Sequence, residues 1–399
     1  MILENKWMRG AIPALLIHCS IGTVYCWSQL KDEIALSINC ATSDIEWAFS
    51  LAIFFLGMSA AFGGNFVERN VKHSATLSAV CFGLGMIGTS ASIALGSITG
   101  VLLCYGCLMG IGLGIGYLTP VKTLMMWFSE HKGLATGIAI TGFGLAKVIA
   151  SPIIEFMLKY ISISELFFYL GIAYTIIMSV GSLLIKKPNG CSAIKGDKIN
   201  FKNAFKIILN KQYLAIWVVF FINITCGLAL ISQEKTILSY IGLVGSLAII
   251  ASLTAAFNSI GRFGYSTLSD KVKDRGSIYV IIFLSSALLC TFVSVFAFNN
   301  AQIILGMLVI GCLIGCNAGY GGGFSTLPSL LSDKFGMKNV SVIHGFALSA
   351  WAWAGLVGNH LGNYLLSNHG IAVLFLILSV LYLMAYLITK MFICKQITK

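Results

Sequence analysis

ITGVLLCYGCLMGIGLGIGYLTP, residues 98–120, decides the fold class because it is a long apolar stretch without a single charged residue. A helix of about 20 apolar residues spans the roughly 30 Å hydrocarbon core of a bilayer. An isolated strand in lipid would leave its backbone groups unpaired, so helix is the form that can cross. The stretch therefore predicts a transmembrane helix.

The rest of the chain repeats this pattern. Of its 399 residues, 58% are hydrophobic and 10% are charged, whereas a soluble protein carries about 25% charged residues. We predict an all-α membrane protein with twelve transmembrane helices, the other eleven lying at 9–30, 46–66, 74–96, 133–156, 165–185, 212–232, 246–268, 277–298, 301–325, 341–364 and 371–392.

A long polar stretch divides these runs into two sets of six. It covers residues 186–210 and predicts a linker between an N-terminal half, 1–185, and a C-terminal half, 211–399. An acid followed by bases closes the second run of each half, a weak internal echo that supports duplication. Two six-helix halves around a midplane site form a parallel-repeat plan. We expect these charged residues to form ion pairs between the halves, which we call the latch; the alternative is that they only orient the loops. The residues are Glu68, Arg69, Lys72, Asp270, Lys271 and Arg275.

The net charge of +12 has a simple explanation in membrane topology. With the N-terminus inside, most of the 26 Lys and Arg residues fall on inner segments, and Lys31, Lys159 and Lys235 fall on outer loops. This asymmetry follows the positive-inside rule. We therefore expect cytoplasmic N- and C-termini, a plasma (inner) membrane location, and the lipid bilayer rather than nucleic acid as the surrounding partner.

Two cations, Arg262 and Lys147, remain within predicted spans. A charge at the centre of a span costs about 2.5–3.5 kcal/mol on insertion scales, so it usually faces a cavity and has a function. The planar fork of Arg262 can hold a carboxylate through two parallel hydrogen bonds, or it can snorkel to the latch. Lys147 suits a second anion contact, a structural role, or a lysine kept neutral by burial.

Embedded acids are missing from the predicted spans, since no Asp or Glu falls at mid-depth in any of them. This disfavours a cation carrier, and it favours exchange or a coupling proton carried elsewhere. His18 is the one titratable candidate at mid-membrane depth.

The sequence also predicts no enzyme, no metal and no cofactor. The 12 cysteines lie mostly in apolar runs, where Cys behaves as a small hydrophobe; this includes Cys104 with Cys107 and Cys312 with Cys316. Paired catalytic carboxylates, an H-E-x-x-H motif and a nucleotide-binding G-x-x-x-x-G-K-[ST] loop are absent.

A set of motifs carries a more specific resemblance. In order they are GTVYCWS at 22–28, FFLGMSAAFGG at 54–64, GIGYLTPV at 114–121, Trp127-Phe128, GLATG at 133–137, Asn258, Gly261-Arg262, Ser269-Asp270 and GGGFSTLP at 321–328. Over nearly the whole chain this resembles the oxalate/formate antiporter family of the major facilitator superfamily. The resemblance implies an alternating-access carrier of small carboxylates, with Arg262 binding the substrate and Tyr25, Tyr117 and Tyr320 beside it. We expect the protein to be a monomer.

Two departures from the family bear on the substrate. Lys147 stands where relatives have a small residue, and Trp351 stands where oxalate-exchanging members carry a lysine. One cation with an aromatic wall that includes Phe324 and Trp351 suits a monocarboxylate such as pyruvate, lactate or formate, coupled to a proton or a counter-anion. The alternatives are an oxalate-type dicarboxylate/formate exchanger that uses Arg262 and Lys147, and a transport-like membrane sensor or channel.

Overall fold

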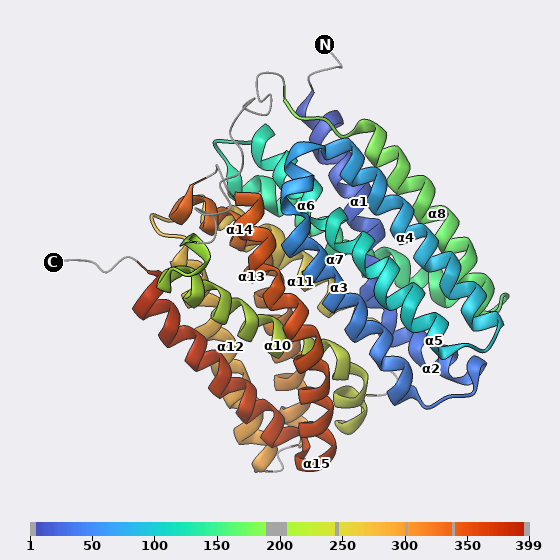
Figure 1. Ribbon diagram of the computed structural model, residues 1–399. Helices are drawn as coiled ribbons and strands as arrows, with labels where there is room; N and C mark the ends of the chain where they lie inside the picture. The colour runs from blue at the N-terminus through green and yellow to red at the C-terminus, as the bar shows by residue number, and fades with distance from the viewer. Residues whose placement is uncertain (1–4, 189–205, 244–246, 300–301, 337–339, 395–399) are drawn as a thin grey trace.

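The computed structural model describes residues 5–188, 206–243, 247–299, 302–336 and 340–394, and over these ranges the chain is helical, without strands. The first part of the chain (Figure 1) contains η2 (Trp7–Ala11), α1 (Ile12–Ile21), η3 (Gly22–Cys26), α2 (Trp27–Ile38), α3 (Thr42–Arg69), α4 (Val71–Ala94), α5 (Ile98–Val101), η4 (Leu102–Met109), α6 (Gly110–Trp127), α7 (Lys132–Met157) and α8 (Ile163–Leu184). The second part contains α10 (Lys211–Tyr240), α11 (Leu247–Ser269), α12 (Gly276–Phe298), α13 (Gln302–Phe335), α14 (Val340–Ala347), α15 (Ser349–Ile388) and η6 (Thr389–Ile393).

Ten helical stretches within these ranges are long and apolar enough to cross a membrane. The last of them, Val342–Ile393, leaves the helical conformation at Gly370, where φ is 80°, so it comprises two spans. Glycine suits this break because it lacks the Cβ that disfavours positive φ. The helix α11 corresponds to the predicted span 246–268. With these two additions the helices are consistent with the twelve predicted spans.

The seventh span differs from its prediction. It was predicted over 212–232, but α10 continues to Tyr240 and keeps Gln233 and Glu234 buried. A hydropathy pattern ends a span at its first polar residues, whereas the helix continues wherever neighbouring helices cover those residues. A carboxylate is therefore embedded in the protein where the sequence predicted none.

The helices form two groups. Those up to α8 lie on one side of the molecule and those from α10 onward on the other (Figure 1). The groups meet where α7 packs on α11 and where α3 packs on α14 and α15. The predicted linker at 186–210 falls between them, and its residues 189–205 lie outside the described part of the chain.

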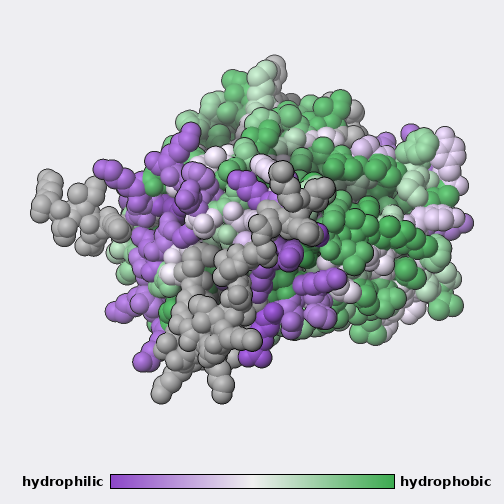
Figure 2. All heavy atoms as spheres, turned by 90° about the horizontal axis from the view of Figure 1, so that it is seen from above, coloured by the Kyte–Doolittle hydropathy of each residue, from purple (hydrophilic) through white to green (hydrophobic). Residues whose placement is uncertain are grey.

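Close helix crossings stabilise the contact between the two groups of helices. A Cβ on Gly57 of α3 would come within 2.6 Å of the backbone of Leu348 and Ala352, so only glycine lets these helices approach. Seen from above, hydrophilic side chains gather toward the left of the visible face, and apolar side chains cover most of its upper and right parts (Figure 2).

The crossing of α11 and α13 provides a test of this packing. A Cβ on Gly261 would lie 2.1 Å from the carbonyl oxygen of Ala318. We expect Gly261→Ala to destabilise the protein by about 1–3 kcal/mol, the usual cost of overpacking, and to lower its melting temperature in detergent. Gly264→Ala in the same helix is the matched control, because no atom lies within 4 Å of its Cβ position. Equal melting temperatures for the two variants would contradict the observed crossing.

Candidate functional site

Arg262 lies at the centre of the molecule on α11 and is completely buried. Its Nε donates to Oδ1 of Asn258, one turn earlier, at 2.8 Å, and its Nη1 donates to the carbonyl of Ile140 at 3.4 Å. Its Nη2 has no hydrogen-bond partner. The guanidinium is thus oriented by its own helix and by α7, and one side of it remains available.

The charge of Arg262 is not compensated by an acid among the residues that the structure describes. Instead, the guanidinium carbon lies 5.4 Å from the ring centroids of both Phe143 and Phe324. Aromatic faces attract a cation only weakly, by about 0.5–2 kcal/mol. Phe143 was not recognised from the sequence, although it lies one turn before Lys147 on the same helix.

Four rings from both halves surround this cation, and we call them the aromatic cluster: Tyr117 of α6, Phe143 of α7, Phe324 of α13 and Trp351 of α15. Their neighbouring centroids are 4.4 to 6.5 Å apart. The predicted residues Tyr117, Phe324 and Trp351 are therefore brought together around Arg262, although they are far apart in sequence.

Tyr25 and Tyr320 complete the predicted set. Their hydroxyl oxygens are 2.7 Å apart, so they join η3 of the first half to α13 of the second. The Tyr320 ring contacts Phe324 with centroids 5.0 Å apart. The pair closes the aromatic cluster on one side.

Three buried donor groups in this region lack a partner: the Tyr117 hydroxyl, the Trp351 Nε1 and the Arg262 Nη2. Each unsatisfied buried donor costs about 1–3 kcal/mol. Unpaired donors around one buried cation have the chemistry that an oxyanion would satisfy.

His18 lies buried on α1 and contacts two neighbouring helices. Its Nδ1 contacts the carbonyl of Ala139, and its Nε2 lies 3.1 Å from the carbonyl of Tyr117. Its ring stacks on Tyr117 with centroids 5.3 Å apart. His18 therefore holds the backbones of α6 and α7 and contacts the aromatic cluster through Tyr117.

The second embedded cation, Lys147 of α7, has an acidic partner. Its Nζ lies 3.7 Å from Oε2 of Glu234 on α10, and both side chains are buried. Thr254 of α11 donates a hydrogen bond to Oε1 of Glu234 at 2.5 Å. The expectation that the spans hold no embedded acid was wrong. The periodicity of α10 could have shown it, since Leu230, Glu234 and Ile237 continue one buried face.

Lys147 and Glu234 separate two cavities. The larger, which we call the vestibule, has a volume of about 380 Å³ and is lined by residues that include the exposed Glu33 and Glu155. The smaller has about 20 Å³ and is lined by residues that include Tyr25 and Asn258. A path thus leads from the end of α7 through the vestibule to the ion pair, and then to Asn258, which accepts a hydrogen bond from Arg262.

The opposite end of α7 is closed by Asp270 of the predicted latch. Its two carboxylate oxygens accept the backbone N–H groups of Gly133 and Leu134, each at 2.9 Å. Arg275 also donates to this carboxylate at 2.8 Å. An acid of the second half therefore binds the positive end of a helix dipole of the first half.

The other predicted latch residues contribute less in this structure. Arg69, Lys72 and Lys271 are exposed, and the Glu68 side chain lies outside the described residues. Two residues that the sequence analysis missed take part instead. Lys132 lies 3.6 Å from Asp333, and Arg275 donates to Asp333 at 2.5 Å.

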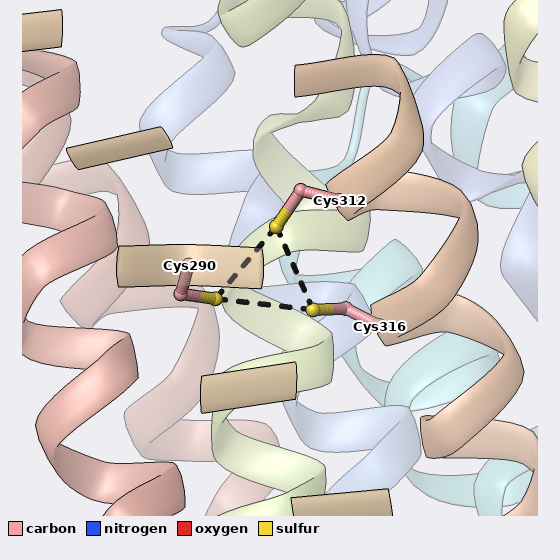
Figure 3. A group of neighbouring side chains, drawn as sticks. All are labelled: Cys290, Cys312 and Cys316. Carbon is pink, nitrogen blue, oxygen red and sulfur yellow. Dashed lines mark hydrogen bonds between the residues drawn. The ribbon is translucent and has the colours of Figure 1, made fainter. Parts of the chain in front are cut away.

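Three cysteines meet inside the second half (Figure 3). The sulfur atoms of Cys290, Cys312 and Cys316 are 3.7 to 3.8 Å apart, and all three residues are buried. Such a group can hold a soft metal ion as thiolates, but several thiolate charges buried at this depth would be costly. We retain the interpretation of these residues as neutral packing side chains, with Cys290 as a third member that sequence spacing does not reveal.

Comparisons with known proteins agree with this architecture. The family model described as Major Facilitator Superfamily matches residues 19–359. The "Oxalate:formate antiporter" of Oxalobacter formigenes is 26% identical over 390 residues, which cover 96% of this chain and 91% of that protein. "Apicoplast pyruvate carrier 1" of Toxoplasma gondii is 22% identical over 460 aligned positions, which cover 86% of this chain and 81% of that protein.

A solved structure shares the fold. The crystal structure of the major facilitator transporter FucP in the outward conformation matches with a TM-score of 0.67 and 16% identity, covering 95% of this chain and 97% of FucP. The family match spans most of the chain and the matched proteins are carriers rather than enzymes. The chain is therefore a multi-pass membrane transporter that belongs to the major facilitator superfamily.

Proposed function

We propose that this protein is a secondary active transporter of small carboxylate anions, with Arg262 as the residue that binds the anion. The observation that carries the proposal is a completely buried guanidinium with an unpartnered nitrogen and no acidic partner among the described residues. Burying a charge is costly unless it is paired, and a bidentate carboxylate is the partner that an arginine fork fits best. The names of the relatives, oxalate:formate antiporter and pyruvate carrier, support this substrate class.

The substrate we favour is a monocarboxylate such as pyruvate, lactate or formate. Glu234 already balances the charge of Lys147, which leaves one uncompensated cation for the substrate. The aromatic cluster, with Trp351 in place of a second cation, offers an apolar wall to a short carbon chain.

Exchange of an oxalate-type dicarboxylate against formate is the second candidate. The similarity to an oxalate:formate antiporter favours it. It requires Lys147 to leave Glu234 and to bind the second carboxylate of the substrate.

Transport would proceed by alternating access between the half at 1–185 and the half at 211–399. The proposal is supported by the vestibule at one end of α7 and by the hydrogen bonds of Asp270 to the backbone of Gly133 and Leu134 at the other end. We assign the latch end to the cytoplasmic side, with both termini, because the basic residues concentrate there. We further propose a monomer in the plasma (inner) membrane.

Replacement of Arg262 tests the binding site. We expect Arg262→Gln to reduce carboxylate uptake into proteoliposomes about a hundredfold or more, since truncating one partner of a buried charge pair costs about 2–5 kcal/mol. Arg262→Lys should restore little activity, because it lacks the planar fork. The exposed Arg69, replaced by Gln, is the control. Wild-type uptake by Arg262→Gln would refute the assignment.

A panel of radiolabelled substrates tests the choice of carboxylate. We expect the wild-type protein in proteoliposomes to transport pyruvate, lactate or formate in preference to oxalate, because its free positive charge matches one carboxylate. Empty liposomes provide the background for passive diffusion of the acids. Efficient oxalate transport with no monocarboxylate transport would favour the dicarboxylate exchanger instead.

The latch can be tested without a substrate. Asp270→Asn removes the charge that holds the first turn of α7. A hydrogen bond to a charged group contributes about 1.5–3 kcal/mol, so we expect amide hydrogen exchange at Gly133 and Leu134 to become about tenfold faster or more, measured by mass spectrometry. Asp274→Asn is the matched control, since Asp274 pairs with Lys334 of its own half at 3.2 Å. Unchanged exchange in Asp270→Asn would exclude the latch role.

A further inference from the structure

The buried ion pair between Lys147 and Glu234 is the second charged feature of the path, and the function assigned to Arg262 does not use it. We propose that Glu234 is the proton-binding residue of this transporter. It binds the proton when an incoming carboxylate draws Lys147 away from it. The inference rests on the proposed function, because it requires a carboxylate substrate. It makes the transporter a symporter that carries one proton with each monocarboxylate.

The position of the pair is the first argument. Lys147, Glu234 and Ile231 line both the vestibule and the smaller cavity beyond it. The smaller cavity also contacts Asn258, which orients the Arg262 guanidinium. An anion that moves from the vestibule toward Arg262 therefore passes directly beside Lys147.

The geometry of the pair is the second argument. Direct charge-assisted N–H···O bonds are about 2.7–2.9 Å long, but the Nζ of Lys147 lies 3.7 Å from Glu234. Glu234 is held from its other side by the Thr254 hydroxyl at 2.5 Å. The carboxylate is therefore fixed to α11, whereas the lysine ammonium sits on a flexible stem and can follow an incoming anion.

The consequence for the proton follows from burial. Without its cation, a carboxylate in a low-dielectric site favours the protonated form. The substrate carboxylate is then held by Arg262 and by the Lys147 ammonium that has followed it, and Glu234 takes one proton from the water of the vestibule. The added charges of the anion and the proton cancel. After release at the other side, Lys147 returns to Glu234, and the proton leaves with the substrate.

The charges around the pair favour a proton step. Four carboxylates and two ammonium groups line the vestibule, and Asp32 is 3.6 Å from Lys235. The excess negative charge of the vestibule raises the local concentration of protons, which are then available to Glu234 at its inner end. On the vestibule side, the titratable groups that face the pair are Asp32 and Glu33 from α2, Glu155 from α7 and Lys235 from α10. On the inner side, the titratable and polar groups are Tyr25 and Cys26 from η3, Thr254 and Asn258 from α11, and Asn317 and Tyr320 from α13. Arg262 lies beyond Asn258.

His18 is a second buried side chain that could carry a proton, and it lies beside the aromatic cluster. Both of its ring nitrogens contact backbone carbonyls, of Ala139 and Tyr117, and these contacts tie it to the helix backbones rather than to the vestibule. Glu234, which lines both cavities, is the better placed of the two for exchange of a proton with water.

The experiment compares two transport modes in proteoliposomes that contain a trapped pH indicator. One measures uptake of labelled pyruvate, lactate and formate driven by an inward proton gradient, together with the accompanying acidification. The other measures exchange of labelled against unlabelled substrate at equal pH. We expect Glu234→Gln to retain exchange while losing proton-driven accumulation and acidification about tenfold or more, within the range of ordinary coupling between two sites.

Three further variants make the result specific. Lys147→Gln combined with Glu234→Gln removes both charges, and exchange in this variant shows that the protein is folded even if the single variant is unstable. Glu155→Gln, an exposed vestibule residue on the same helix as Lys147, is the matched control: it should keep the wild-type ratio of protons to substrate, and only the rate should fall if the vestibule charge supplies protons. His18→Gln is expected to keep the wild-type ratio of protons to substrate, although its uptake can fall because His18 contacts Tyr117 of the aromatic cluster.

The outcomes separate this inference from the function on which it rests. If the wild-type protein moves no carboxylate in either mode, the anion-transporter function itself is refuted. If it exchanges carboxylates without any proton flux, or if Glu234→Gln keeps full proton coupling, the anion function stands and the proton role of Glu234 is refuted. Coupling that is lost in His18→Gln and kept in Glu234→Gln also refutes it.

Discussion

A positive charge enclosed without a counter-ion is the constraint on which the rest of this structure depends. The Arg262 guanidinium is completely buried, two of its nitrogens are satisfied by Asn258 and a backbone carbonyl, and the third is unpartnered. An unpaired buried charge is costly, and an anion between the two halves would relieve that cost. Rings from α6, α7, α13 and α15 exclude water from the site, which strengthens any electrostatic interaction that forms there.

The two embedded cations differ in one respect that organises the proposed mechanism. Lys147 is balanced by Glu234 and lies where the vestibule narrows, whereas Arg262 is unbalanced and lies deeper. An entering anion would thus meet a compensated cation first and an uncompensated one afterwards. At the other end of α7, the Asp270 carboxylate binds backbone N–H groups of the opposite half.

Sequence reasoning was most successful where a property belongs to single residues. Long apolar runs predicted the helices, and the cost of a charge in lipid singled out Arg262 and Lys147 before any contact was known. It failed where the property belongs to pairs. Glu234 was placed outside its span because polar residues end a hydropathy pattern, yet α10 continues and Lys147 covers the acid. Lys132 with Asp333, and Cys290 with Cys312 and Cys316, were missed because their partners lie far apart along the chain or on another helix.

The sequence by itself determined that this chain crosses a membrane many times and carries a cation within it, because the cost of transferring each side chain into lipid depends on that side chain alone. Only the tertiary structure decided which charges are balanced. Whether a buried lysine is free or paired, and whether an arginine faces a carboxylate or an aromatic ring, depends on contacts of a few ångströms between helices distant in sequence. Such contacts are set by how the helices cross, which no single stretch of sequence specifies.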